Sequence, residues 1–277
     1  MEGDRSGFKQ AIGLARNSET VVAVMGEDCW QSGEARSQMD IDLKGNQIEL
    51  LQELYAVNKN VIVILMTGRP VPLQELAANS KAILQTWYGG SEAGNAIADA
   101  LFGDYNPSGK LPVSFPYHGG QEPLYYSRKS TGRMSPAGNV FWSHYTDGPN
   151  EAFYPFGHGL SYTSFSYADL KVTDSGESLD VSVQVTNIGE KEGVETVQLY
   201  IRDLAASIVR PIKELKGFEK VTIAAGASAE VSFSLTKEDL SFYNNEAQKV
   251  FEAGEFDVFV GSNSVDLLSN RVSVDWN

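Results

Sequence analysis

An acidic loop offers the clearest candidate for chemistry in this sequence. Residues 26–35 follow a continuous apolar run at residues 21–25 and place three carboxyl groups, those of Glu27, Asp28 and Glu34, near Trp30. A carboxyl group beside an aromatic ring can be partly desolvated, which favours its protonated form and suits it to donate a proton. A solvated acidic loop is the commoner outcome, so both interpretations stay open at this point.

Aromatic and histidine side chains form a second group of candidates. Trp30, Tyr126, Trp142 and Tyr145 could each offer a flat face to a sugar ring, because aromatic side chains join an apolar surface to polar edges. His144 lies close to an aspartate in the sequence and could form a polar binding pair with it. We take Trp30, Trp142 and His144 as candidate substrate-binding residues, although packing or a surface position would be ordinary for each.

A glycine-rich turn at residues 88–94 has some features of a phosphate-binding turn. No basic residue follows it, and Glu92 would repel an anion, so we expect a tight turn with Ser91 as the helix N-cap. A nucleotide-binding α/β protein remains a third alternative.

The sequence predicts neither a metal ion nor an organic cofactor. Its one cysteine, Cys29, and its three histidines are scattered along the chain, whereas a zinc site needs several such ligands together. The Gly-x-Ser-x-Gly signature of serine esterases does not occur.

The first half of the chain alternates helix and strand patterns, which predicts an α/β fold with a largely parallel, helix-covered sheet. Ligands of such sheets lie beyond the carboxyl ends of the strands, where the acidic loop begins. The run at residues 21–25 is typical of a strand covered on both faces. Helices are expected at residues 8–16, 47–57, 73–78 and 92–102, and strands at residues 21–25, 61–66, 82–87 and 111–115.

The second half follows a different pattern. Residues 116–164 show no sustained period, and from residue 165 apolar residues alternate with polar ones. Seven or so short strands over the last 110 residues predict an all-β antiparallel sandwich of immunoglobulin or fibronectin type III style.

Length and charge narrow the classes of function. The 277 residues suffice for two domains, and the net charge of −14 makes nucleic acid and anionic membrane surfaces unlikely partners because both would repel the chain. No apolar run reaches the roughly 18 residues that span a bilayer. Residues 1–20 lack the apolar segment of a secretory signal, and the compartment stays open.

Several segments together resemble glycoside hydrolase family 3, the β-glucosidase and β-xylosidase group. They occur in family order and cover nearly the whole chain. The matching segments are the acidic loop with Ser32-Gly33-Glu34-Ala35, the strand and turn at residues 65–71, the runs at residues 87–96 and 101–112, the junction at residues 154–162, and residues 215–220.

The resemblance implies a retaining glycosidase that hydrolyses terminal β-D-glucosides or xylosides. Retention requires two carboxyl groups about 5–5.5 Å apart, one acting as nucleophile and the other as acid and then base. In similar family members the α/β domain carries the proton donor, and the resemblance places that residue at Glu34 of this sequence. Glu27 is expected to have a structural role. Full-length members are often periplasmic or secreted.

The resemblance starts part-way through the family's architecture. Family members carry the catalytic Asp on a (β/α)8 barrel, which nothing in this sequence resembles. We therefore expect a truncated, mostly parallel three-layer α/β sandwich at residues 1–118, an irregular connector at residues 119–164 and a fibronectin type III-like domain at residues 165–277.

The missing nucleophile leads us to expect that this chain alone is inactive and that it works with a barrel domain in cis or in trans. We also expect an unpaired edge strand in the α/β sheet, and self-association through it. The alternative is a non-catalytic module that binds carbohydrate or protein.

Overall fold

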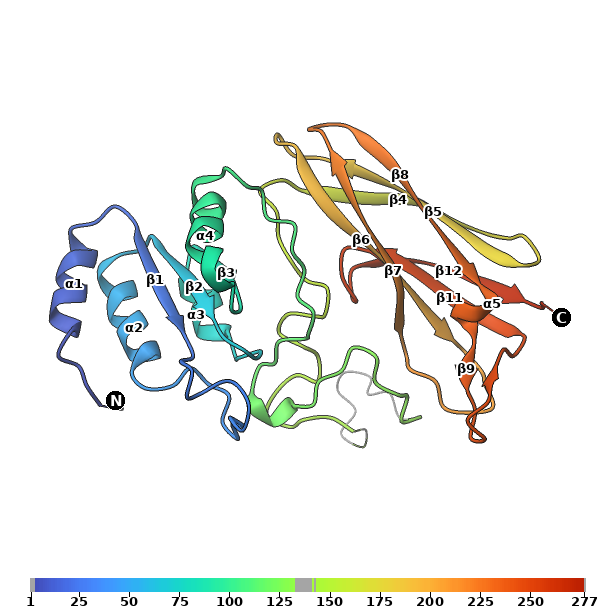
Figure 1. The fold of residues 1–277 in the computed structure, drawn as a ribbon, viewed down its shortest axis with the longest axis horizontal. Helices are drawn as coiled ribbons and strands as arrows, with labels where there is room; N and C mark the ends of the chain where they lie inside the picture. The colour runs from blue at the N-terminus through green and yellow to red at the C-terminus, as the bar shows by residue number, and fades with distance from the viewer. Residues whose placement is uncertain (1–2, 133–140, 142, 277) are drawn as a thin grey trace. The chain divides into compact units, whose positions relative to one another are not determined.

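The computed structural model describes residues 3–132, 141 and 143–276 of the chain (Figure 1). The chain forms two compact units, each built from separate segments. The first comprises Met1–Asp104, Phe115–Pro123 and Gly148–Phe153, and the second comprises Tyr105–Ser114, Leu124–Asp147 and Tyr154–Asn277. The division at residues 118 and 164 made from the sequence stays a prediction.

The first unit contains a parallel sheet of three strands in the order β1-β2-β3, with helices in the connections (Figure 1). This confirms the α/β prediction. The middle strand carries the most buried residues of the sheet, since it has a neighbour on either side. The elements are α1 (Phe8–Arg16), β1 (Val21–Gly26), α2 (Gln47–Val57), β2 (Val61–Met66), α3 (Gln74–Asn79), β3 (Ala82–Gln85), the 3₁₀ turn Gly90–Glu92, α4 (Ala93–Phe102) and the 3₁₀ turn Gly119–Gln121.

The edge strand β1 is covered on one face only. Ala23 and Met25 are buried, whereas Val22 and Val24, which point to the opposite face, are 48% and 62% exposed. The prediction that this strand is covered on both faces is therefore wrong for this chain. Ile64, the neighbour of Val24 on β2, lies on the same face of the sheet and is fully buried. On this face the chain therefore covers β2 but leaves β1 exposed.

Two further local predictions are wrong. Residues 111–115 form no strand, because the amide and carbonyl of Leu111 pair with His158 and Gly157 and because Pro112 offers no N–H to a ladder. Ser91 lies inside the 3₁₀ turn that precedes α4 and makes no capping hydrogen bond; the helix begins after Glu92.

The second unit contains the predicted antiparallel sandwich, which confirms the all-β assignment. Within the described residues, seven strands form two sheets, in the orders β4-β5-β8 and β12-β11-β6-β7. A short hairpin, β9 (Phe242–Tyr243) with β10 (Lys249–Val250), and helix α5 (Lys237–Leu240) lie beside them. The seven strands are β4 (Phe165–Asp174), β5 (Ser178–Asn187), β6 (Gly193–Asp203), β7 (Glu214–Ile223), β8 (Ser228–Thr236), β11 (Gly254–Gly261) and β12 (Leu267–Val274).

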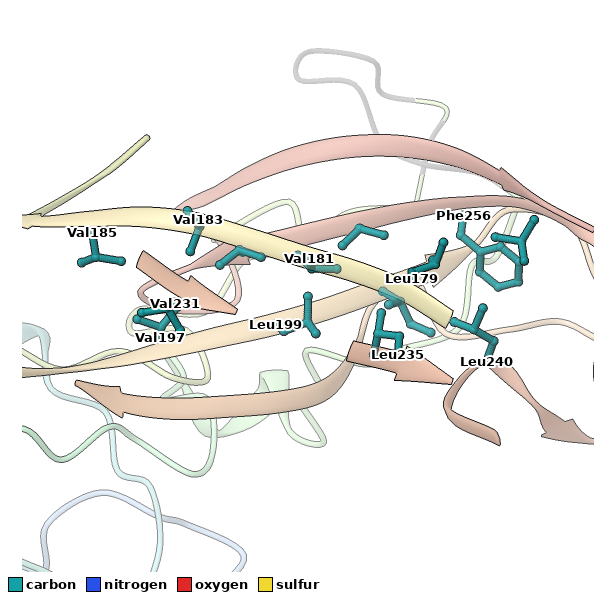
Figure 2. Packing of buried hydrophobic residues seen from close by; sticks show 14 of the residues in the cluster. Leu179, Val181, Val183, Val185, Val197, Leu199, Val231, Leu235, Leu240 and Phe256 are labelled. Atoms are coloured by element: carbon teal, nitrogen blue, oxygen red, sulfur yellow. The ribbon is translucent and has the colours of Figure 1, made fainter. Parts of the chain in front are cut away.

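The alternation in the sequence explains the sandwich core. Every second residue of β5 faces the other sheet, so Val181 and Val183 are buried in one cluster with residues such as Leu199 and Phe256 (Figure 2). Contacts of this kind fill the space between the two sheets, and the sandwich therefore closes its own core.

A buried polar network ties irregular segments of the second unit to β6. Lys110 Nζ lies 3.2 Å from Glu195 Oε2, and the Tyr167 hydroxyl donates to Glu195 Oε1 at 2.7 Å. Lys110 also donates to the Gly159 carbonyl at 3.1 Å. Residues 105–114 and 154–162 are thus fixed to the sandwich rather than forming strands of their own.

Candidate active site

The acidic loop leaves the sheet at the carboxyl ends of two neighbouring strands. Gly26 is the register partner of Met66, and the Glu27 amide donates to the Met66 carbonyl at 2.9 Å. A Cβ at Gly26 would lie 1.9 Å from the Met66 carbonyl oxygen, so only glycine permits this approach. The side chain of Gln47 bonds both the amide and the carbonyl of Gly26, which fixes the start of the loop.

The first carboxylate of the loop is buried in an ion pair. Glu27, with a side chain 5% exposed, lies 2.9 Å through Oε1 from Arg69 Nε. Its other oxygen accepts the Gly68 amide at 3.0 Å. Glu27 is therefore fully engaged with the turn that follows β2, in keeping with the structural role expected for it.

The second carboxylate shapes the loop backbone. Asp28 Oδ1 accepts the amides of Trp30 and Gln31 at 2.8 and 3.1 Å, and the Gln31 side chain returns a bond to the Asp28 amide at 3.0 Å. Aspartate commonly begins turns in this way. The carboxylate of Asp28 is thus used in local structure.

The third carboxylate, Glu34, is exposed to solvent. Within the described part of the chain it has no hydrogen-bond or ion-pair partner; only its backbone carbonyl is contacted, by Arg36 at 3.5 Å. The next residue, Ala35, has a φ of 57°, a left-handed conformation that is unfavourable for alanine. The loop therefore holds a free carboxyl group at a strained turn.

Trp30 lies in the same loop and is 73% exposed. The Arg36 guanidinium stands 5.3 Å from the centre of its ring, a cation–π distance. An exposed indole held by a neighbouring side chain offers a flat apolar surface in the loop that also carries Glu34.

The remaining predicted residues are placed as follows. His144 is exposed and belongs to the second unit, so the structure does not relate it to Trp30 or Glu34. Trp142 lies outside the described residues. Among the residues that the structure does describe, no three His, Cys, Asp or Glu side chains are grouped as a metal would require.

The glycine-rich turn after β3 is explained by backbone geometry. Gly90 has a φ of 71°, and a Cβ at Gly89 would lie 2.9 Å from the Cβ of Ala93. Just before it, Trp87 adopts a φ of 53° while its ring packs 5.9 Å from that of Phe115. These contacts require glycine here without any phosphate.

Arg69 is the site residue that the sequence analysis missed. Besides Glu27, its Nη2 donates to the carbonyls of Gln31 and Arg36, at 2.6 and 3.1 Å. A buried arginine needs an acidic partner, but the sequence does not show that Arg69 is buried. The 42-residue separation from Glu27 hid that partner.

Comparison with known protein families supports the assignment from the motifs. Residues 3–162 match the glycosyl hydrolase family 3 C-terminal domain. The chain belongs to glycoside hydrolase family 3. Residues 195–264 match the fibronectin type III-like domain, so both parts predicted from the sequence are confirmed.

Relatives in family 3 extend well beyond this chain. A periplasmic β-glucosidase of Salmonella typhimurium is 44% identical over 92% of this chain and 34% of its own length. A β-xylosidase of Formosa agariphila is 41% identical over 94% of this chain and 36% of its own length. The chain thus spans about a third of the family 3 relatives that it matches.

The same relation holds for solved family 3 structures. The β-glucosidase of Listeria innocua in complex with glucose superposes with a TM-score of 0.92 at 42% identity, over 99% of this chain and 39% of that chain. The fold described above is therefore the C-terminal part of a family 3 β-glucosidase architecture. In the described residues, no helix is both long and apolar enough to cross a membrane.

Proposed function

We propose that this chain supplies Glu34 as the acid/base carboxyl group of a retaining glycosidase acting on terminal β-D-glucosides or β-D-xylosides. The observation that carries the proposal is the contrast among the three loop carboxylates. Glu27 is buried in an ion pair and Asp28 caps a turn, whereas Glu34 is exposed and unengaged in the described part of the chain.

The reaction needs two proton transfers at one carboxyl group. Glu34 gives its proton to the glycosidic oxygen as a nucleophilic carboxylate attacks C1 and the C1–O bond breaks. The resulting Glu34 carboxylate then takes a proton from water, which attacks C1 and releases the nucleophile. A carboxyl group in contact with solvent can perform both steps without breaking a bond to the protein.

The nucleophile of this reaction belongs to a second domain in the proposal. The other carboxylates of the loop, Glu27 and Asp28, already accept hydrogen bonds from the fold. The resemblance to family 3 implies a (β/α)8 barrel as the source of the missing carboxylate. Without it the chain is inactive, because one of two essential groups is absent.

The open face of β1 supports such a partner. Parallel sheets are normally covered on both faces, and the exposed Val22 and Val24 leave an apolar surface in water. A second domain that covers this surface would remove it from solvent. In its absence the same surface promotes self-association.

Sugar recognition is assigned in part to Trp30. Its exposed ring lies in the same loop as Glu34 and could stack on a pyranose. Trp142 and His144 stay candidates for the same task. Relatives named β-glucosidase and β-xylosidase indicate a neutral β-linked glycoside, which suits a chain with a net charge of −14.

The proposal is tested by reconstitution. The chain is assayed on aryl β-glucosides and β-xylosides alone and after mixing or fusion with the N-terminal two-thirds of the Salmonella relative. We expect activity only in the reconstituted enzyme, and its loss on Glu34→Gln but not on Asp42→Asn, an exposed acid nearby in the sequence. Hydrolysis by the chain alone that survives Glu34→Gln would contradict the proposal.

A further inference from the structure

We propose that Arg69 is the positioning residue of the acid/base loop: its guanidinium fixes residues 31–36, and with them Glu34, to the end of the parallel sheet. The inference rests on the proposed role of Glu34. Arg69 itself touches no part of the reaction and acts through the loop backbone.

Arg69 starts from a rigid base. The buried Thr67 hydroxyl donates to the Arg69 carbonyl at 2.8 Å, and the Gln85 side chain on β3 donates to the Thr67 hydroxyl at 3.2 Å. The side chain of Arg69 is only 19% exposed. The backbone from which the guanidinium extends is therefore fixed by hydrogen bonds to Thr67 and, through it, to β3.

The guanidinium contacts the loop through two hydrogen bonds and one ion pair, in which Nε makes no hydrogen bond. Nε faces the Glu27 carboxylate, and Nη2 donates to the carbonyls of Gln31 and Arg36. The last two residues bracket Glu34, which lies three positions after one and two before the other. A planar guanidinium can hold a carboxylate and two carbonyls together, which the single ammonium group of lysine does less well.

The loop needs such an anchor because its turn is strained. Ala35 keeps a left-handed conformation next to Glu34, and such conformations persist only where the surroundings fix them. A second contact holds the loop in place. The Ser32 side chain packs so closely against Gly68 that a Cβ at Gly68 would lie 2.0 Å from the Ser32 hydroxyl. Anchor and strain together define one position for Glu34.

The first test uses the chain as it is and a spin label on its single cysteine, Cys29, which is exposed in the loop. Arg69→Lys keeps the charge facing Glu27 but loses the planar fork. We expect the motionally restricted component of the spectrum to be largely lost in Arg69→Lys, with the far-ultraviolet circular dichroism unchanged.

The matched control is Arg5→Lys, which alters an exposed arginine of the same unit that pairs with Glu49 at 3.1 Å. Its spectrum should equal that of the unsubstituted chain. An unchanged spectrum in Arg69→Lys would overturn the proposal. So would an equal change in both variants, because it would show general loosening in place of a specific anchor.

A second readout separates positioning from simple stability. In the reconstituted enzyme, Arg69→Lys should lower kcat for phenyl β-glucoside by about 10²-fold, the scale of a misplaced catalytic group, with KM nearly unchanged. Hydrolysis of 2,4-dinitrophenyl β-glucoside should change little in its first step, since that leaving group needs no proton. Equal losses of kcat/KM on both substrates, a ratio that reports the first step, would overturn the positioning role.

The two proposals fail separately. If Glu34→Gln leaves hydrolysis intact while Arg69→Lys frees the spin label, the acid/base assignment is wrong and the anchor stands. If Glu34→Gln abolishes hydrolysis while the label stays restricted in Arg69→Lys, the anchor is wrong and the acid/base assignment stands.

Discussion

The two units of this protein differ in how completely their main sheets are covered. The sandwich of the second unit closes its core between two antiparallel sheets, and Phe256 and Val183 at its centre are about 1% exposed. The parallel sheet of the first unit leaves Val22 and Val24 of β1 in solvent. The two sheets of an antiparallel sandwich bury each other's apolar faces, whereas a parallel sheet needs helices or another domain packed on both of its faces.

The difference has a functional meaning. The self-sufficient sandwich carries no residue that we assign to the reaction, while the unit with the incompletely covered sheet carries Glu34, the proposed acid/base group, and Arg69, its proposed anchor. The proposed acid/base group therefore belongs to the unit whose sheet keeps an exposed apolar face. The proposed proton transfer thus lies in the first unit, while His144 of the second unit stays a candidate for sugar binding.

The largest expected effect is on the free energy of unfolding and comes from a Phe→Ala substitution made once in each unit. Phe256→Ala removes a buried ring from the sandwich and should lower the free energy of unfolding of that unit by about 3–5 kcal/mol. Phe102→Ala at the end of α4, where the ring is 84% exposed, should change stability by about 0.5 kcal/mol or less. Urea titration followed by circular dichroism measures both, and similar losses would remove the distinction.

A second pair replaces valine by the isosteric threonine. Val183→Thr puts a hydroxyl into the closed core and should cost about 1–3 kcal/mol, since no partner awaits it. Val24→Thr should leave stability nearly unchanged and reduce the binding of a hydrophobic dye and any self-association seen by light scattering. Dye binding that is unaffected by Val24→Thr would show that the open face of β1 is not accessible in solution.

A third pair concerns backbone strain at positive φ. Ala35→Gly should stabilise the first unit by about 0.5–1 kcal/mol, because glycine relieves the left-handed strain while adding entropy to the unfolded chain. Asp169→Gly, at a φ of 54° in β4, should give no gain, since aspartate tolerates this conformation. Thermal unfolding distinguishes them; a gain at Asp169 equal to that at Ala35 would argue against strain specific to the loop.

The smallest effect is a pH dependence of the second unit. Burial lowers the pKa of His158, and Lys110 lowers it further, while Asp266 opposes this. The unfolded state then binds more protons than the folded state just below the ordinary histidine pKa of about 6.5, so stability falls as the pH drops below that value. His158→Gln should flatten this part of the stability profile; an identical profile would assign the dependence to other groups.

The sequence predicted regular elements well where one pattern governs a whole strand. The alternation from Leu179 to Val185 is sufficient to define β5, because each apolar side chain must face the core. Residues 111–115 misled for the opposite reason: their apolar character suggested a strand, but Leu111 pairs with Gly157 and His158, far away in the sequence. The sequence also could not predict which faces of β1 are covered, since an apolar run does not reveal what packs on each face of a strand.

The candidate site was predictable only in part. Composition could mark the acidic loop, but the choice of Glu34 over Glu27 came from the resemblance to family 3. The structure adds the reason that Glu27 is occupied, its ion pair with Arg69. That ion pair joins residues that follow two different strands, and no local sequence pattern predicts it.

The most direct test of the account is azide rescue of Glu34→Gln in the reconstituted enzyme. The account predicts that kcat for phenyl β-glucoside falls by about 10²–10⁴-fold. It also predicts that with 2,4-dinitrophenyl β-glucoside added azide restores turnover and yields β-glucosyl azide, because the anion attacks C1 without needing a base. Wild-type turnover by Glu34→Gln, or an inactive variant that gives no glucosyl azide from that substrate, would contradict the assignment of Glu34 as the acid/base group.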